Sequence, residues 1–241
     1  MATLIDYTPK TSFKGETSNK METNGIQQII KNVVTFDLLY LDKNTNKTLV
    51  VSCSGVYIQN GMIMTACHVF YDNLIFLTID NLKIGNQSVP VDNWKYIKND
   101  AYIKDKDDCH DIAFLINNNH IDDTLQEINF ELYDHSNLVY ISWFDCKQLP
   151  FIVNLIKSTS GDDMGLTSND ELLVCEGDLE LVDGCSGGPV FNVDSSGEFK
   201  LVGILNSCSK NNDGYLSVFS TIKENIDYVN YVINTREYIT E

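Results

Sequence analysis

The sequence predicts an all-β protein, because short apolar runs rich in β-branched and aromatic residues alternate with clear turn signals. One pair of these runs is separated only by Asn60-Gly61, a dipeptide that favours a two-residue β-hairpin turn. The chain has 241 residues, the size of one large all-β domain or of two small fused barrels. Hydrophobic residues make up 43% of it, which is enough to form a core.

The first set of expected strands follows a polar segment. Residues 1–25 are rich in Thr, Lys, Ser and Asn, and we interpret residues 1–30 as an N-terminal extension with a short helix at Gly25–Lys31. The charged stretches Lys98–Asp100 and Lys104–Asp108 are expected to be a surface loop. Strands are expected at Val33–Leu41, Thr48–Gln59, Met62–Thr65, Leu74–Ile79 and Asp111–Ile116.

A second set of strands fills the rest of the chain and ends in a helix. Asp194–Gly197 is typical of a hairpin turn, and Thr221–Ile233 has apolar residues at near-helical spacing. The second set of strands is expected at Leu138–Trp143, Phe151–Ser158, Glu171–Cys175, Pro189–Asn192, Lys200–Asn206 and Gly214–Phe219.

The segment Gly184-Cys185-Ser186-Gly187-Gly188-Pro189 places a serine between glycines. A glycine before a nucleophilic serine lets the backbone N–H groups of Gly184 and Ser186 turn toward one point and form an oxyanion hole. The glycines after Ser186 leave room for a substrate carbonyl. Glycine-rich turns are common, so this motif gains weight only from a base and an acid elsewhere.

Both partners are present. Thr65-Ala66-Cys67-His68 ends an apolar run in a histidine, and Asp111-Ile112-Ala113-Phe114-Leu115 begins one with an acid. With Gly184–Pro189, these blocks occur in the order His, Asp, Ser, and the chain from about Val33 to about Asn234 resembles the chymotrypsin-like (trypsin-like) serine peptidases. The resemblance implies two antiparallel six-stranded β-barrels with the site between them and a short C-terminal helix. We place the first barrel at 31–128, the second at 129–220, and the helix and tail at 221–241.

In this interpretation Ser186 is the nucleophile of a serine endopeptidase and needs a base within hydrogen-bond reach. His68 would take its proton and later donate it to the leaving amine, while Asp111 would fix the histidine tautomer. The polypeptide substrate would be cleaved through an acyl-enzyme. The alternative is a catalytically silent module of the same fold with a binding role or a structural role in a particle. A self-processing peptidase that later serves as a structural protein is a third possibility.

Other residues compete for these roles and fit less well. Cys185 is one position out of register with the nucleophile and should point away from His68. A zinc site from Cys53 and the pairs Cys67-His68 and Cys109-His110 matches no compact zinc spacing, so we expect neither a metal nor a cofactor. The rival acids are Asp107 and Asp108, and the rival bases are His110, His120 and His135.

Cys185 also marks a departure from the digestive members of the family. The resemblance places an Asp there, paired with a processed N-terminus, and a neutral thiol cannot replace it in an ion pair. The residues Pro189–Asn192 and the pair His68-Val69 are closer in style to the glutamyl-endopeptidase and HtrA-like branch. We therefore expect no activating cleavage at the N-terminus.

The resemblance implies that the substrate pocket is built from residues before Ser186 and from the strand through Gly203–Cys208. Glu180 would lie near the base of the pocket and Asp183 near its entrance. If Glu180 points inward, it would favour a basic residue before the scissile bond; a solvent-facing Glu180 is the alternative. Substrate binding by β-augmentation is expected at Asn206, Ser207 and Cys208.

The net charge and the cysteine content limit which partners and which cellular compartment are expected. A formal net charge of −17 argues against binding to nucleic acid, and no apolar run reaches the roughly 20 residues of a membrane span. The N-terminus lacks the pattern of a secretory signal, and seven cysteines is an odd number. We therefore expect a cytoplasmic or other reducing compartment. Abundant Asn, Ile and Lys fit an AT-rich genome, such as that of some large viruses or protists, and association with a virion is included in this expectation.

Overall fold

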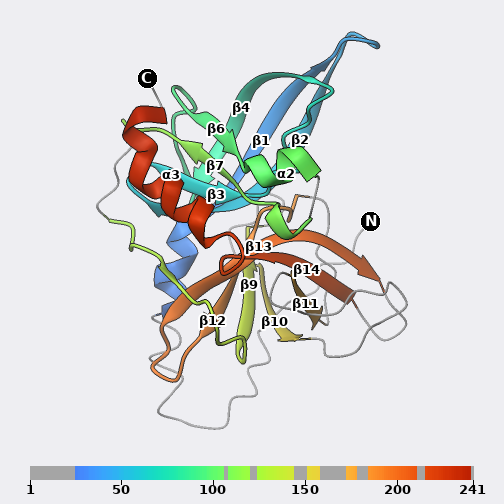
Figure 1. Ribbon diagram of the computed structural model, residues 1–241. Coiled ribbons are helices and arrows are strands. Elements are labelled where there is room, and N and C mark those ends of the chain that lie inside the picture. The colour runs from blue at the N-terminus through green and yellow to red at the C-terminus, as the bar shows by residue number, and fades with distance from the viewer. Residues whose placement is uncertain are drawn as a thin grey trace, which may run out of the picture.

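The computed structural model describes residues 25–105, 108–119, 124–143, 151–157, 172–177, 184–210 and 215–239, and it contains two sheets of seven strands each. The first sheet comes from the N-terminal half of the chain and the second from the C-terminal half (Figure 1). The short α2 (Asp100–Asp105) lies beside the first sheet, and α3 (Ile226–Ile239) follows the last strand and returns to the first sheet (Figure 1).

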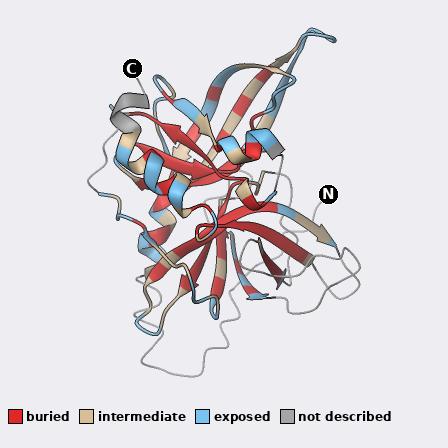
Figure 2. Cartoon of the chain, in the orientation of Figure 1, coloured by how far each residue is buried: buried red, intermediate tan, exposed pale blue. Residues whose placement is uncertain are grey.

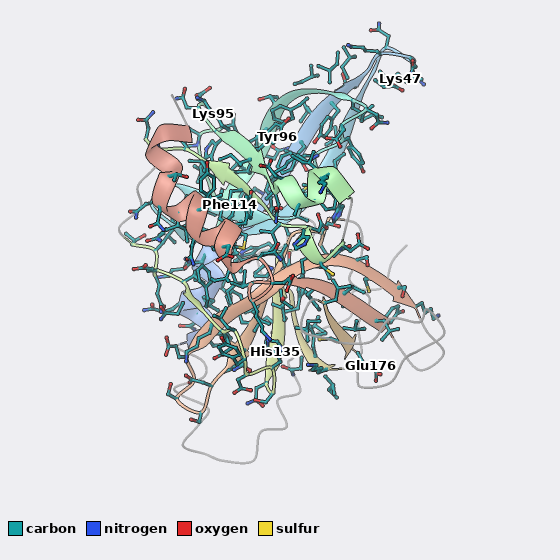
Figure 3. The ribbon with its side chains drawn as sticks, in the orientation of Figure 1. Lys47, Lys95, Tyr96, Phe114, His135 and Glu176 are labelled. Carbon is teal, nitrogen blue, oxygen red and sulfur yellow. The ribbon has the colours of Figure 1, made fainter. Side chains whose placement is uncertain are left out.

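The first sheet has the strand order β5-β4-β1-β2-β3-β7-β6 and no hydrogen-bonded pairing between its outer strands among the described residues, so it is a curled open sheet. A long hairpin of two of its strands projects from the body, with Lys47 near the tip (Figure 3). The predicted Asn60-Gly61 turn is confirmed, because both residues have positive φ, 46° and 74°. The strands are β1 (Val33–Asp42), β2 (Lys47–Gln59), β3 (Met62–Thr65), β4 (Ile75–Ile84), β5 (Gln87–Ser88), β6 (Lys95–Lys98) and β7 (Ala113–Ile116).

The second sheet has the order β12-β9-β10-β11-β14-β13-β8, and an additional β12–β13 pairing closes six of these strands into a barrel. β8 is added outside the barrel as a parallel neighbour of β13. The strands are β8 (Asn129–Phe130), β9 (Leu138–Ser142), β10 (Phe151–Lys157), β11 (Leu172–Gly177), β12 (Pro189–Val193), β13 (Phe199–Lys210) and β14 (Tyr215–Thr221).

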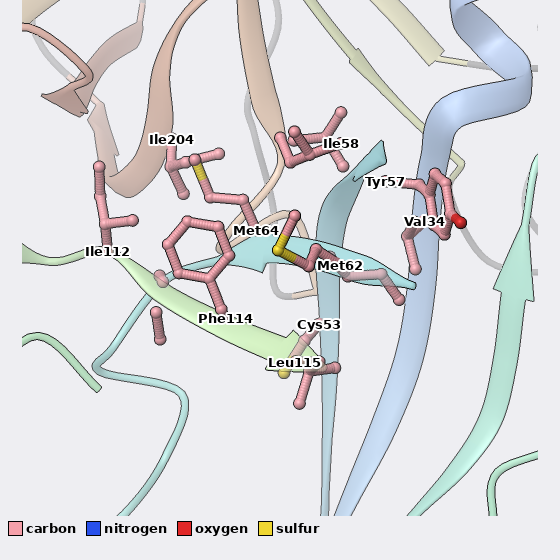
Figure 4. Close-up of a cluster of buried hydrophobic side chains, with 14 of the residues drawn as sticks. Val34, Cys53, Tyr57, Ile58, Met62, Met64, Ile112, Phe114, Leu115 and Ile204 are labelled. Carbon is pink, nitrogen blue, oxygen red and sulfur yellow. The ribbon is translucent and has the colours of Figure 1, made fainter. Parts of the chain in front are cut away.

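The larger hydrophobic cluster joins both sheets and the C-terminal helix. Buried residues are concentrated in the strands of both sheets (Figure 2), and Phe114 of β7 and Met64 of β3 lie close to Ile204 of β13 in this cluster (Figure 4). Tyr228 of α3 contacts Phe114 edge to face, with ring centroids 5.7 Å apart. The helix is therefore held on the first sheet by the same core that joins the two sheets.

The segment predicted as a surface loop is instead ordered structure wherever it is described, and residues 106–107 lie outside the described residues. Lys95–Lys98 pairs with β7 as β6, and α2 (Asp100–Asp105) follows it. Asn99 is 5% exposed: its side chain accepts a hydrogen bond from the Ala101 N–H and donates one to Asn225. Asp100, Lys104 and Asp108 are exposed, whereas the Lys98 side chain is 7% exposed and pairs with Asp72, and the buried asparagine fixes the segment. The prediction of a loop was wrong because it relied on the charge of the segment alone.

The two predicted helices are present with shifted limits. Residues 25–29 are helical and continue into η1 (Ile30–Asn32), as predicted near Gly25–Lys31. The C-terminal helix begins at Ile226 rather than near Thr221, because residues 222–225 form a turn. None of the helices in the described ranges is both long enough and apolar enough to cross a lipid bilayer.

Candidate active site

His68 and Asp111 lie together just beyond neighbouring ends of two paired strands. β3 ends at Thr65 and β7 begins at Ala113, and these two residues face each other in the antiparallel register. The chain turns after Ala66, so that His68 folds back toward Asp111, two residues before β7. His68 and Asp111 are therefore brought together in space because β3 and β7 pair.

The Asp111 carboxylate accepts two hydrogen bonds from the same residue. The His68 backbone N–H donates to Oδ1 at 2.7 Å, and the ring nitrogen Nδ1 lies 2.6 Å from Oδ2. The Asp111 side chain is 1% exposed, whereas that of His68 is 32% exposed. A carboxylate facing Nδ1 keeps the proton on that nitrogen, which leaves Nε2 able to accept a proton from a solvent-facing partner.

The loop that carries Asp111 is held by the other sheet and by the turn before α3. The short helix η2 (Asp108–His110) directly precedes Asp111. The Asp108 carbonyl accepts hydrogen bonds from Ser220 Oγ at 2.6 Å and from Asn206 Nδ2 at 3.3 Å. Asn225 Nδ2 donates to the Cys109 carbonyl at 2.8 Å. The position of the carboxylate thus depends on both sheets.

Ser186 lies in a tight turn packed on the segment that leads to His68. Gly187 has φ +84° and donates its N–H to the Leu205 carbonyl at 2.9 Å. A Cβ on Gly187 would overlap Thr65 Oγ1 and the Ser54 carbonyl, so only glycine allows this contact. Within the part of the chain that the structure describes, no hydrogen bond joins Ser186 Oγ to the His68 ring. Such bonds are often long in free enzymes and shorten when substrate binds.

Cys185 faces the interior. Its side chain is 2% exposed and belongs to a second hydrophobic cluster with Tyr140, Val190 and Leu205. Gly184, which precedes it, has φ +93°, a value that favours glycine. Among the described cysteines, none forms a disulfide.

The residues predicted to bind substrate are placed in part. Asn206 is 8% exposed and its side chain is directed to the Asp108 carbonyl, so it supports the Asp111 loop. Ser207 is exposed and Cys208 is half-buried on the same strand. Glu180 and Asp183 lie outside the described residues.

The rival acids and bases do not approach His68 or Ser186 in the described part of the chain. Asp108 is exposed and takes part through its backbone. His110 Nδ1 lies 3.3 Å from Asn225 Oδ1, and the pKa of His135 is lowered by its burial. Asp107 and His120 lie outside the described residues, and no three His, Cys, Asp or Glu side chains of the described ranges are grouped as a metal site.

Sequence reasoning missed the polar residues that support the site from the elements around it. Four of them are serines or a tyrosine inside β-strands, and the fifth is an asparagine in the turn before α3; only the folded chain gives them a partner. These residues are Ser54, Tyr140, Ser142, Ser220 and Asn225.

Comparison with known proteins supports the fold and goes no further. No family model matches the sequence, and no curated protein matches it. Among solved structures, the chain is similar to the Rv3671c protease from M. tuberculosis in its active form, with a TM-score of 0.58 and 15% sequence identity. The similarity covers 95% of this chain and 93% of that one. The predicted chymotrypsin-like fold is thereby confirmed, and it is the fold of a protease.

Proposed function

We propose that the protein is a serine endopeptidase that uses Ser186 as nucleophile, His68 as base and Asp111 as the residue that orients the base. The observation that carries this proposal is the double hydrogen bond from His68 to the buried Asp111 carboxylate. It leaves the second ring nitrogen of a part-exposed histidine available, and the turn that carries Ser186 packs against Thr65 and Ala66, just before that histidine. A purely structural Asp–His pair would not require that arrangement.

In the reaction, Ser186 Oγ attacks the carbonyl carbon of the scissile peptide bond while its proton moves to His68 Nε2. The negative charge that develops on the substrate oxygen is stabilised by the N–H groups of Gly184 and Ser186. The protonated His68 then gives its proton to the leaving amine as the C–N bond breaks. Water, activated by the same histidine, hydrolyses the acyl-enzyme and regenerates Ser186.

The edge of β13 offers a place for the substrate backbone. β13 pairs with β12 only as far as Ile204, whereas its pairing with β14 continues to Lys210. Along Asn206–Cys208 its other edge has no strand partner in the described ranges. An extended peptide could add there as a further strand, with its scissile bond carried toward Ser186. The net charge of −17 would favour basic or neutral peptides on encounter.

The motif style adds a proposal on activation. We propose that the chain is closest in its motifs to the glutamyl-endopeptidase and HtrA-like branch of this fold. In that case its active site needs no ion pair with a newly formed N-terminus. Cys185, buried among apolar side chains, supports this because it carries no charge to pair. Activity that appears only after removal of residues 1–30 would contradict it.

A second candidate is a silent module of the same fold with a binding or structural role. It is favoured by the missing hydrogen bond between Ser186 Oγ and the His68 ring. In that case the buried Asp111–His68 pair would be retained only as a structural contact.

A fluorophosphonate probe separates the two candidates. The wild type should be labelled and Ser186→Ala should not, while Cys185→Ala should be labelled like the wild type because its thiol is buried in the core. Absence of labelling in all three folded proteins would support the silent module. Loss of labelling in folded Cys185→Ala would instead point to a cysteine nucleophile.

A further inference from the structure

Hydrogen bonds hold the carbonyl groups of three successive residues around Ser186. The Gly184 carbonyl accepts from Ser54 Oγ at 2.7 Å, the Cys185 carbonyl from the Tyr140 hydroxyl at 2.8 Å, and the Ser186 carbonyl from the Ser54 N–H at 2.9 Å. The Gly188 N–H also donates to the Cys185 carbonyl at 2.9 Å. Each of these three carbonyl groups is thus held by a hydrogen bond from β2 of the first sheet or from β9 of the second.

The bond from Tyr140 determines where the N–H of Ser186 points. The Cys185 carbonyl and the Ser186 N–H belong to one planar trans peptide, so they point in opposite directions. Tyr140 has no exposed surface, and its hydroxyl draws the carbonyl into the barrel. The Ser186 N–H must then point away from Tyr140 and out of the barrel, and Ser186 itself is only half-buried.

The site is shaped to admit the Tyr140 hydroxyl. Tyr140 lies between Val153 of β10 and Val190 of β12. A Cβ on Gly188 would overlap the hydroxyl and approach the ring to 2.8 Å, so the absence of a side chain there allows the contact. Burial also raises the pKa of Tyr140, which keeps the proton on its hydroxyl available for donation.

No charged group is needed in this arrangement. Ser54 Oγ lies 2.9 Å from Ser142 Oγ, and because Ser54 donates its proton to the Gly184 carbonyl, Ser142 donates to Ser54. Neutral hydroxyls therefore stabilise the turn from the interior. At this place an ion pair is impossible, because the neighbouring side chain is the neutral Cys185.

We propose that Tyr140, assisted by Ser54, is a positioning residue that keeps the Ser186 N–H oriented as an oxyanion donor, in place of a buried ion pair. The inference rests on the proposed peptidase function, because an oxyanion donor matters only if a tetrahedral intermediate forms. It assigns Tyr140 a role in the transition state and none in binding the ground-state substrate.

The test is Tyr140→Phe, which removes only the hydroxyl. Loss of one oxyanion donor costs on the order of 10²–10³-fold in kcat. A donor that is loosened rather than removed should therefore cost about 10–100-fold, with KM changed by less than about twofold. A peptide aldehyde, which forms a tetrahedral adduct with Ser186, should lose affinity by the same factor as kcat. The matching peptide alcohol, which cannot form this adduct, should bind as before.

Tyr228→Phe is the matched control. The Tyr228 hydroxyl also donates to a backbone carbonyl, that of Ile97, at 3.0 Å, but it lies on α3 against the first sheet. This variant should lose stability without loss of kcat. If Tyr140→Phe does not fold, Ser54→Ala, which removes the hydroxyl on the Gly184 carbonyl, should give the same difference between aldehyde and alcohol.

The outcomes separate the two proposals. A folded wild type that reacts with no fluorophosphonate refutes the peptidase and this inference with it. A reactive wild type whose Tyr140→Phe variant keeps its kcat and its preference for aldehyde over alcohol overturns the role of Tyr140 alone. Equal weakening of both ligands would also overturn it, because that result indicates general disruption.

Discussion

Asp111→Asn should abolish most of the activity while leaving the fold intact. The carboxylate accepts from two N–H groups of His68, the backbone N–H at 2.7 Å and ring Nδ1 at 2.6 Å. A carboxamide has one acceptor oxygen and one NH₂ group, so it can satisfy only one of them. If the amide oxygen accepts from the backbone N–H, the NH₂ group faces Nδ1 and donates to it. The ring proton then sits on Nε2, and Nε2 can no longer accept the proton of Ser186. In the opposite orientation, the NH₂ group opposes the backbone N–H.

The size of the loss follows from the contacts that the substitution removes. Two charge-assisted hydrogen bonds are worth roughly 1.5–3 kcal/mol each, and both lie in a site with 1% exposure of the carboxylate. Losing both charge-assisted bonds in the transition state, when the ring carries a positive charge, raises the barrier by about 3–6 kcal/mol. At about 1.4 kcal/mol per tenfold change in rate, kcat should fall by about 10²–10⁴-fold.

The measurement is the hydrolysis of a chromogenic peptide, with thermal unfolding followed on the same samples. Asp108→Asn is the matched control, because its exposed side chain is near the site and only its backbone carbonyl is used. It should retain activity within about threefold. More than a tenth of the wild-type rate in folded Asp111→Asn, or an equal loss in Asp108→Asn, would refute this account of the site.

Three further predictions concern stability and specificity. Gly187→Ala should lower the free energy of unfolding by about 3 kcal/mol or more, measured by urea denaturation, because a Cβ at φ +84° meets Thr65 and Ser54; an unchanged midpoint would contradict the packing. Hydrogen bonds, of which that from Ser196 is the strongest, lower the pKa of Asp194 from 3.8 to about 2, so its stabilisation is complete above about pH 4 and is lost as pH falls through 2. After discounting for solvent screening, Asp194→Asn should cost about 1 kcal/mol at pH 6 and progressively less as the pH falls through 2, and a constant difference in chemical denaturation across this range would speak against it. Glu180→Gln should weaken a preference for basic residues in a peptide-library profile, and an unchanged profile would rule out an inward-facing carboxylate.

The strands were predictable from sequence where apolar periodicity and turn residues agree. Met62–Thr65 was placed without error, and β2 and β12 were placed to within one residue of each limit. β4 extends to Ile84, five residues past its predicted end, because pairing with β1 continues through an irregular stretch in which Asn81 has positive φ. No local pattern indicates such a continuation, which depends on the partner strand.

The candidate site was predictable only where residues act through a recognisable local motif. His68, Asp111 and Ser186 stand in short characteristic segments, and the structure brings the first two into contact. Tyr140 sits in an ordinary apolar strand, and its hydroxyl gains a partner only when residues 45 positions apart meet. Asn225 likewise reaches the Cys109 carbonyl across 116 positions. Supporting residues of this kind become visible only in the folded chain.

The anchoring of the Asp108–His110 turn has a consequence for how the chain can be divided. A fragment ending after β7 would contain both His68 and Asp111, yet it would lack Ser220, Asn206 and Asn225, which hold the carbonyls before Asp111. Such a fragment would carry the acid and the base without the means to keep them aligned. Complementation by the remaining half should therefore restore the geometry of this pair as well as supply the serine. Assembly of the two halves and formation of the acid–base pair are then a single event.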